Sequence, residues 1–522
     1  MLKKILYSLV AVSFMTCATS CNDWLDLKPN NEQITDDYWK SKEDVQSVVM
    51  SGYYYMRQCV PNFIKWGELR GGVFYSSDSG ESKLQDFNMT PSHNLCKYAD
   101  VYKVINAANS VLKYAPGVCS IDDTYAESMM MSHLCEAYFM RAYCYLILVK
   151  NYGSVPLILE PYVDDTESFD IAKSTEAQII EQIKADVMTA LNTDAAKGTY
   201  EVEWETKGRA TKWALYALMA DACLWSEDYE TCKEYCNKIL NATDSFRPVF
   251  ITAGTQWYDM FCFGNSNESI FELNWNYNTA QETNNFASLW SQDASSKFRF
   301  SSSAIRKMQE EVSTAVANGA TVEGRVGRML LASCIPAGGN AAYAVASTFY
   351  MWKYAGTEIQ DPEGGKRVHQ DANFIIYRVS EIMMMLAQAE TMTGNIQEAV
   401  KQVNRIRNRA GIGNFQGIDE DDAGAIANID EQTMLEEILD QKAMEFIGEA
   451  KRWYDVLWFG RIANNKYRDS FVRLVLDGNQ TTNLSWVTSV LADKNSWYMP
   501  IPQVDIDHNV LLEQNPYYSS NK

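Results

Sequence analysis

The sequence has 522 residues, of which 47% are hydrophobic and 22% charged, as in an ordinary globular protein. Acidic residues outnumber basic ones, and the formal net charge is −21. Nucleic acid and anionic lipid bind through basic surfaces, so this charge disfavours both as partners and suits a neutral ligand better.

The start of the chain has the pattern of a bacterial export signal. A short basic start precedes an apolar run at residues 5–15, which is shorter than the roughly 20 residues that span a bilayer. Small residues precede Cys21, whereas bulky Phe14 lies three residues before Cys17. A signal that ends directly in cysteine resembles a lipobox, so we predict a lipoprotein signal peptide over residues 1–20 and acylation of Cys21. The alternative is an ordinary cleaved signal with a nearby cysteine.

Removal of this signal takes away two lysines and no acidic residue, so the net charge falls from −21 to −23. No later segment is apolar over enough residues to cross a membrane, and residues 142–149, the longest candidate, fit one side of a buried helix. Attachment to a membrane therefore depends on the lipid, and the several acyl chains of a bacterial lipoprotein anchor stably.

The cysteines and histidines do not form a metal-binding pattern. Twelve cysteines include no CxxC pair, and the four histidines are scattered at positions 93, 133, 369 and 508. Zinc needs clustered ligands, so we predict no metal and no cofactor. We expect buried free thiols, although disulfides remain an alternative that the sequence cannot pair.

Helical periodicity dominates the first half of the chain. Predicted helices cover residues 42–58, 99–114, 124–150 and 175–191. Ser41 is a candidate cap for the first helix, and Pro116 with Gly117 is expected to end the second.

Two later segments resemble each other at an offset of 167 residues. Residues 217–240 and 385–406 each read as a helix, a tight polar turn and a second helix. In register, Ala220 aligns with Ala387, and small residues of this kind let two helices approach closely. This is typical of tetratricopeptide repeats, and a generic αα-hairpin is an equally good interpretation.

The pattern changes over residues 241–372, which are rich in Gly, Asn, Ser and Thr. Within this loop-rich insert, residues 269–278 alternate strictly between apolar and polar, which predicts a short strand with one buried face. Helices are predicted again at residues 377–391, 395–409 and 431–459, followed by a loop-like tail at 461–522. Arg405, Arg407 and Arg409 are assigned to a helix C-terminus, where cations complement the helix dipole.

An ordered set of segments runs through the whole mature chain. The segments are CNDWLDLKP at 21–29, FMRAYCYLILVKNYGSVPL at 139–157, YRVSEIMMMLAQAE at 377–390, NRIRNRAG at 404–411, KAMEFIGEAKRWYDVLWFGR at 442–461 and WYMPIPQVDIDHNVLLEQNPYY at 497–518. Together they resemble the SusD-like (RagB/SusD) family of Bacteroidetes outer-membrane lipoproteins. The resemblance is weakest over residues 291–370.

This resemblance implies a mostly α-helical fold, with tetratricopeptide-type helix pairs packed against a loop-rich ligand-binding part with short strands. It implies one domain over 21–522, with helical halves at about 42–240 and 373–460. The resemblance also implies a non-catalytic glycan-binding protein of the cell surface, like other family members, anchored in the outer membrane by lipid. They pass oligosaccharides to a SusC-type TonB-dependent transporter. Peptide uptake is one alternative function.

A glycoside hydrolase is the weaker alternative. The sequence contains no GxSxG, HExxH or P-loop motif, although a pair of catalytic carboxylates cannot be found by counting acids. GIGNFQG at 411–417 follows a helix instead of a strand and has a misplaced third glycine, so we interpret it as a helix stop.

Aromatic residues in polar, loop-like sequence are the candidate sugar contacts, because a sugar ring stacks on an aromatic face while its hydroxyls bind nearby amides and charges. One cluster, at residues 65–82, contains Trp66, Arg70, Tyr75 and Asp78. The other, at residues 274–290, contains Trp275, Asn276, Tyr277 and Trp290.

Each candidate also has a packing interpretation. The first cluster can be a turn whose aromatics point inward, and Trp275 can continue the buried face of the strand. For Tyr277 and Trp290 the polar neighbours favour exposure. Five other tryptophans in or beside helical patterns are assigned to packing, namely Trp204, Trp213, Trp225, Trp453 and Trp458.

Overall fold

The computed structural model describes residues 38–163, 168–257, 259–290, 297–319, 328, 335–336, 349–356, 367–481 and 483–519. The predicted signal and Cys21 lie outside these residues. Within them, no helix combines the length and apolar character needed to cross a bilayer.

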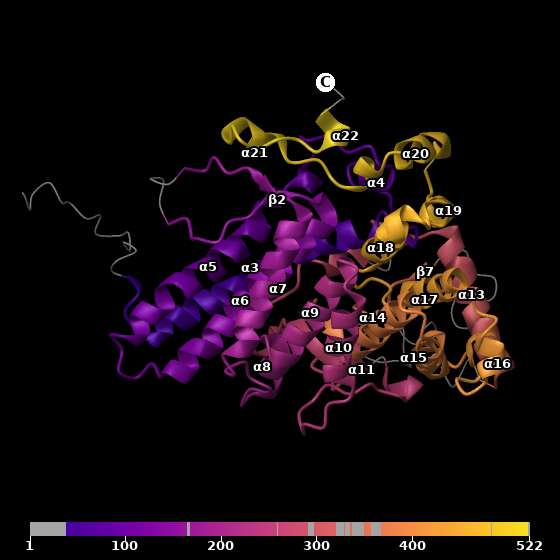
Figure 1. Ribbon diagram of the computed structural model, residues 1–522, viewed down its shortest axis with the longest axis horizontal. Coiled ribbons are helices and arrows are strands. Elements are labelled where there is room, and N and C mark those ends of the chain that lie inside the picture. Colours follow the sequence, from indigo (N-terminus) through magenta and orange to yellow (C-terminus); the bar gives the residue numbers. More distant parts are fainter. Residues whose placement is uncertain are drawn as a thin grey trace, which may run out of the picture.

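Four long helices form one end of the molecule (Figure 1). They are α3 (Lys42–Glu68), α5 (Ala99–Cys119), α6 (Glu127–Tyr152) and α7 (Glu176–Asn192). The helix α5 packs on α3, α6 on α5, and α7 on α6. The helix cap predicted at Ser41 is present and forms a capping box, because its side chain and that of Asp44 each accept the other's main-chain N–H.

Two of these helices run further than the sequence predicts. The helix α3 continues through Pro61 to Glu68, and α5 continues through Pro116 to Cys119. A proline inside a helix removes one hydrogen bond and costs roughly 3 kcal/mol. Burial of the following turn, including Phe63 and Ile64, outweighs that cost in α3.

The two segments that resemble each other form equivalent helix pairs. They are α9 (Lys212–Trp225) with α10 (Tyr229–Leu240), and α14 (Val379–Met392) with α15 (Ile396–Arg409). Contact between α10 and α14 joins the pairs into one succession of helices. The predicted helix-pair architecture is therefore confirmed.

The turns of these pairs match residue by residue. Glu227 and Gly394, which are 167 positions apart, both have a positive φ, at 59° and 85°. The next residues, Asp228 and Asn395, both cap the second helix with their side chains. The offset seen in the sequence is therefore a structural repeat of helix, left-handed turn residue and cap.

The C-terminal part differs most from the prediction. The segment expected as one helix over 431–459 is divided into α17 (Glu431–Glu445) and α18 (Arg452–Asn465). The turn between them has positive φ at Gly448 (76°) and Ala450 (61°), which breaks the helix. The tail expected to be loop-like contains α19 (Arg468–Gly478), α20 (Leu484–Leu491), α21 (Gln503–His508) and α22 (Pro516–Ser519).

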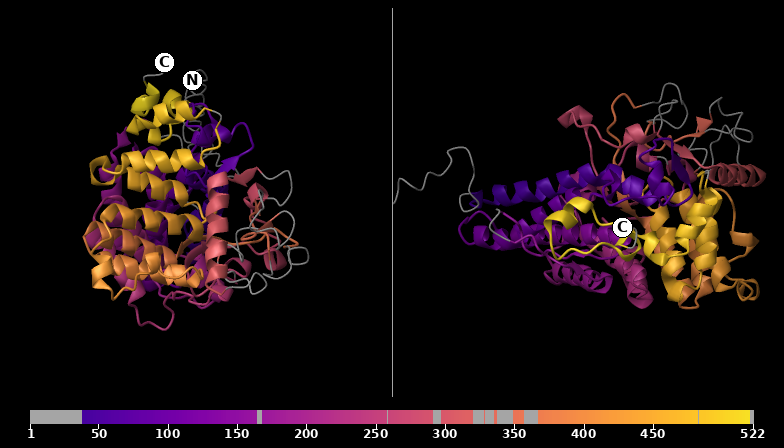
Figure 2. Two further views of the ribbon diagram at one scale, coloured as in Figure 1. Left: turned by 90° about the vertical axis from the view of Figure 1, so that its right-hand side faces the viewer. Right: turned by 90° about the horizontal axis from the view of Figure 1, so that it is seen from above.

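Apart from α13, the remaining helices and strands are short, and most of them lie on one side of the helical layer (Figure 2). The helices are α4 (Ser82–Gln85), α8 (Glu203–Gly208), α11 (Asp259–Cys262), α12 (Tyr277–Ala280), α13 (Ser302–Ala317) and α16 (Ala423–Ile426). The described residues also form four antiparallel strand pairs: β1 (Phe74–Ser76) with β5 (Phe298–Phe300), β2 (Val155–Pro156) with β3 (Lys173–Ser174), β4 (Ser269–Leu273) with β8 (Phe374–Arg378), and β6 (Ile335–Pro336) with β7 (Phe349–Tyr350).

The predicted strand at 269–278 is present but stops at Leu273. Asn276 ends it, because its side chain accepts the main-chain N–H of Thr279 at 2.9 Å and begins α12. The strand β4 is also buried on both faces. Glu272 lies inside, bonded to Ser269 Oγ at 3.1 Å and to Asn373 Nδ2 at 3.2 Å.

A buried network of ion pairs ties the helices to the loop-rich part. Glu445 on α17 lies 2.6 Å from both Arg378 of β8 and Arg409 of α15. Arg378 also contacts Glu268, at 3.1 Å, just before β4. Further members at the edges are Arg328, Glu311, Lys353 and Glu449. Arg409 thus stands in the last turn of its helix, as expected, and also has buried acidic partners.

The cysteines agree with the expectation of free thiols. Eight cysteines of the described residues are free, and all of them except the partly exposed Cys119 are buried, namely Cys59, Cys96, Cys135, Cys144, Cys223, Cys232 and Cys236. Burial raises the pKa of the Cys59 thiol to about 12, which leaves it protonated and unreactive. Within the same residues no cluster of three or more His, Cys, Asp or Glu side chains has the arrangement of a metal site.

Candidate ligand-binding pocket

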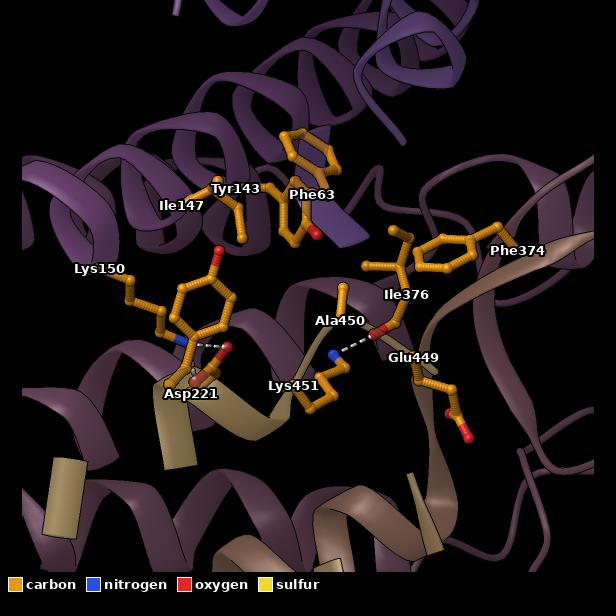
Figure 3. Close-up of a pocket in the computed structure, with 11 residues that line it drawn as sticks. Phe63, Tyr143, Ile147, Lys150, Asp221, Phe374, Ile376, Glu449, Ala450 and Lys451 are labelled. Atoms are coloured by element: carbon orange, nitrogen blue, oxygen red, sulfur yellow. Dashed lines mark hydrogen bonds and ion pairs between the residues drawn. The ribbon is translucent and has the colours of Figure 1, made fainter. Parts of the chain in front are cut away.

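A small interior cavity lies where α6, α9 and β8 meet the turn before α18 (Figure 3). Lys150 and Asp221 face each other there, with Nζ 2.6 and 2.7 Å from the two carboxylate oxygens. Lys451 donates to the main-chain oxygen of Ile376 at 2.6 Å. The volume is about 20 Å³, enough for one water molecule and far too small for a sugar ring. This cavity therefore belongs to the packing between helices.

A much larger pocket opens between α3, α8, α12 and the β4–β8 pair. Its volume is about 480 Å³, which is in the range of small-molecule sites. Both α3 and α8 pack against β4, and this brings distant parts of the chain to one place. Lys207 holds α8 there by donating to the main-chain oxygen of Ser269 at 2.6 Å, and burial lowers the pKa of Lys207 to about 8.

Among the described residues, five aromatic side chains line this pocket, including the buried Tyr53 on α3. Tyr54 on α3 and Trp204 on α8 are 49% and 48% exposed, and Phe263 is 75% exposed. Trp275 is 7% exposed and lies beside Arg57, whose guanidinium carbon is 5.8 Å from the ring centroid. Large apolar side chains gathered in one concave surface mark binding sites more often than scattered ones do. The exposed rings of Tyr54, Trp204 and Phe263 can stack on a flat apolar ligand face.

Asparagine amides surround the rings, at positions 265, 274, 276, 278 and 373. Two of them hold the wall in place. Asn274 Nδ2 donates to the main-chain oxygen of Trp204 at 3.2 Å, and Asn373 Oδ1 accepts from Trp275 N at 3.1 Å. Asn276 and Asn278 are exposed. An amide both donates and accepts hydrogen bonds, so this lining suits uncharged hydroxyl groups.

Two ion pairs have both partners in the described lining of the pocket. Arg57 binds both carboxylate oxygens of Glu282, at 2.6 and 3.0 Å. Arg367 donates to Asp371 Oδ1 at 3.0 Å. A glycosidase needs two carboxyl groups facing the scissile bond, one of which donates a proton. Here each of the two acids is engaged by an arginine, which favours a structural role.

The second predicted cluster contributes two residues to the pocket. Trp275 and Asn276 line it. Tyr277 is the first residue of α12 and is partly exposed, and its ring stacks on His369 with centroids 3.4 Å apart. Asn276 and Asn278 on either side of Tyr277 both line the pocket, so this tyrosine lies at its margin.

The expected exposure of Trp290 is wrong. Its side chain is 3% exposed and packs against Phe74 and Phe298, with ring centroids 4.8 and 5.0 Å away. Those rings lie on β1 and β5, which pair with each other and cover the indole. The polar residues before Trp290 therefore do not make it a ligand contact.

The prediction of Trp66 and Arg70 as ligand contacts is also wrong, because both are buried. Trp66 donates its indole N–H to the main-chain oxygen of Leu95 at 2.8 Å. Arg70 donates to Asn151 Oδ1 at 2.8 Å and stacks on Trp453, with its guanidinium carbon 4.3 Å from the ring centroid. The inward-pointing alternative is the correct interpretation of this pair.

Tyr75 and Asp78 are partly exposed, but neither lines the pocket. Asp78 Oδ1 accepts the main-chain N–H groups of Glu81 and Gly80, at 3.1 and 2.9 Å. These hydrogen bonds lower the pKa of Asp78 and stabilise a turn. A ligand role for these two residues stays an untested prediction.

Four of the five pocket aromatics are not predicted as ligand contacts from the sequence, namely Tyr53, Tyr54, Trp204 and Phe263. Trp204 was assigned to packing, which is wrong, whereas the same assignment is correct for the buried Trp213, Trp225, Trp453 and Trp458. The signal was available, since Trp204 lies between Glu203 and Glu205 in a short polar helix. Tyr54 and Phe263 had no comparable signal.

Two family models match this chain. Residues 333–518 match the SusD family, and residues 23–224 match a family described as starch-binding associating with outer membrane. A SusD-like protein of Formosa agariphila is 22% identical, over 84% of this chain and 88% of its own length. A SusD-like protein of Bacteroides ovatus is also 22% identical, over 98% of this chain and 97% of its own length.

Solved structures share the fold. A SusD superfamily protein of Bacteroides thetaiotaomicron has a TM-score of 0.69 and 20% identity, covering 92% of this chain and 99% of that protein. A laminarin-binding SusD-like protein has a TM-score of 0.66 and 16% identity, covering 92% and 100%. Two family models match toward the two ends of the chain, relatives align along most of its length, and solved structures share its fold. This protein therefore belongs to the SusD-like family.

Proposed function

We propose that the pocket between α3, α8 and α12 binds an oligosaccharide at the cell surface and leaves it intact. The observation that carries this proposal is the combination of half-exposed Tyr54 and Trp204 with a lining of five asparagines. Pyranose C–H faces stack on such rings, while amides bind the hydroxyls. The laminarin-binding relative and the starch-binding description of one matched family support the same ligand class.

Two alternatives have weaker support. A glycoside hydrolase needs free carboxyl groups, whereas Glu282 and Asp371 are both paired with arginines. A peptide carries charged termini and often charged side chains that need partners, and an amide lining with paired charges offers few. A non-catalytic glycan-binding protein therefore fits the pocket best.

Replacing Trp204 with alanine should weaken oligosaccharide binding by about five- to thirtyfold, because one ring contact contributes ~1–2 kcal/mol. The measurement is isothermal titration of the chain without residues 1–20. Trp486 on α20 is the matched control, since it is 42% exposed but does not line the pocket. Trp486→Ala should bind normally. Equal losses in both variants, or cleavage of the bound oligosaccharide, would contradict the proposal.

We further propose that Cys21 is acylated, and that the protein sits at the outer membrane on a SusC-type TonB-dependent transporter. Two observations support these proposals: Cys21 follows small residues, and one matched family is described as associating with the outer membrane. In fractionated cells, wild type should be in the membrane fraction and should co-purify with a transporter after detergent extraction. Cys21→Ala should be released, whereas Cys17→Ala should not. Membrane retention of the Cys21→Ala protein would contradict acylation at this site, and migration without a transporter would contradict the partnership.

A further inference from the structure

The charges that line the pocket determine which glycans it can accept. Among the described residues, five lining side chains are charged, namely Arg57, Arg209, Arg367, Glu282 and Asp371. An acidic sugar binds through a cation that is free to contact its carboxylate or sulfate. A pocket for acidic glycans therefore needs an arginine whose guanidinium group is free to bind the sugar.

The guanidinium group of Arg57 is not free. Its two terminal nitrogens bind the two carboxylate oxygens of Glu282 at 2.6 and 3.0 Å, in the forked geometry of the strongest ion pairs. Nη1 also donates to the main-chain oxygen of Asn274 at 3.0 Å. The arginine nearest to Trp275 and Tyr54 is thus used to hold the wall of the pocket.

The other two arginines also have acidic partners. Arg367 binds Asp371 at 3.0 Å and the main-chain oxygens of Phe261 and Cys262. Arg209 binds both oxygens of Glu136, at 2.7 and 2.9 Å, and Glu205 at 3.3 Å. No described arginine of the lining therefore lacks an acidic partner.

An anionic sugar in this pocket faces two unfavourable choices. It can displace Glu282 or Asp371, which leaves that carboxylate without its cation, or it can lie in the pocket without a cation of its own. The acidic chain adds long-range repulsion, since its formal net charge is −21. Uncharged hydroxyls meet neither penalty and can use the asparagine amides.

We propose that the ligand is an uncharged glycan, and that the arginine pairs, above all Arg57–Glu282, exclude glycans that carry uronate or sulfate groups. This inference rests on the proposed function. It assigns Arg57 and Glu282 to specificity: the pair holds the wall of the pocket and occupies the only guanidinium beside the Trp275 ring among the described residues.

The first test uses oligosaccharides that differ only in charge: galactose against galacturonate oligomers, mannose against mannuronate oligomers, and sulfated against desulfated galactans. The probes are immobilised on an array, and hits are titrated by calorimetry. Neutral members should bind at least about tenfold tighter than their acidic counterparts, because a desolvated anion lacks a charge-assisted bond. Tighter binding of an acidic member overturns this inference alone. Binding of no oligosaccharide, neutral or acidic, overturns the proposed function as well.

The second test frees the cation. Glu282→Gln removes the carboxylate that occupies Arg57, so the ratio of acidic to neutral affinity should rise about tenfold relative to wild type. Asp244→Asn is the matched control, because it removes the same charge from an exposed pair with Lys212, outside the pocket, and should leave the ratio unchanged. An unchanged ratio in a folded Glu282→Gln protein overturns the role given to this pair. An equal rise in both variants attributes the effect to net charge and also overturns it.

Discussion

Replacing Glu445 with glutamine should lower the free energy of unfolding by about 3–5 kcal/mol, which is the usual cost of removing one partner from a buried ion pair. Glu445 is 1% exposed and contacts Arg378, Arg409 and Arg328. Glutamine keeps the size of the side chain but removes its charge. The variant would therefore retain buried guanidinium groups with less compensation, in a region where water cannot replace the lost partner.

The location of Glu445 makes this loss global. Its arginines come from β8, α15 and the segment after α13, so one carboxylate joins the helix pairs to the loop-rich part. Its Oε1 also accepts the indole N–H of Trp257 at 3.0 Å. We expect the urea-induced unfolding of the whole chain, measured by circular dichroism, to shift to a lower urea concentration.

The same residue predicts a pH dependence. Burial alone would raise the pKa of Glu445, but Arg409, Arg378 and Arg328 hold this pKa well below its ordinary value. A carboxyl group whose pKa is depressed by folding stabilises the protein fully above its unfolded pKa of about 4.3, and this stability is lost as the pH falls towards the folded pKa. Below about pH 4 the difference in stability between wild type and Glu445→Gln should therefore narrow.

Glu436 on the same helix provides the control. It pairs with Arg473 at 3.0 Å near the surface, where Arg473 is exposed and Glu436 is partly exposed. Exposed pairs contribute about 0–1 kcal/mol, so Glu436→Gln should unfold almost like wild type. If Glu445→Gln behaved like Glu436→Gln, the buried network would not be holding the two parts of the fold together.

Much of the helical fold can be predicted from the sequence, because burial repeats locally every 3.6 residues. The two helix pairs are the clearest case, since the turn residues Glu227 and Gly394 and the caps that follow them recur at a fixed offset. The ends of helices are less predictable. The length of α3 depends on the burial of the turn after Pro61, which tertiary contacts decide.

Part of the candidate site follows from the sequence and part does not. Trp275 and Asn276 stand in amide-rich sequence beside a strand, so the local pattern indicates them. Tyr54 and Trp204 lie on separate helices and reach the same pocket only because α3 and α8 both pack on β4. No local sequence pattern indicates that these two side chains line the same pocket. Polar neighbours also mislead where a strand pair covers a ring, as β1 and β5 cover Trp290.

Trp66 offers the sharpest contrast between the two interpretations. The local sequence favours an exposed ring in a polar turn. If the ring were exposed, Trp66→Ala would weaken ligand binding and leave the stability of the fold unchanged. In the structure Trp66 is fully buried near the end of α3, with Phe63 and Tyr152 at ring-centroid distances of 6.2 and 6.0 Å. Its position three residues after Phe63 continues the buried face of the helix, which is the signal that the polar neighbours obscured.

We therefore expect Trp66→Ala to lower the free energy of unfolding by about 3–5 kcal/mol, through the cavity it leaves and the lost indole hydrogen bond to Leu95. Thermal unfolding measures this loss, and affinity measured well below the lowered melting temperature should match wild type. Trp204→Ala should behave in the opposite way, because its half-exposed ring contributes within about 0.5 kcal/mol to folding and much more to binding. A Trp66→Ala protein that melts like wild type but binds weakly would place the ligand at the end of α3 instead of in the pocket between α3, α8 and α12.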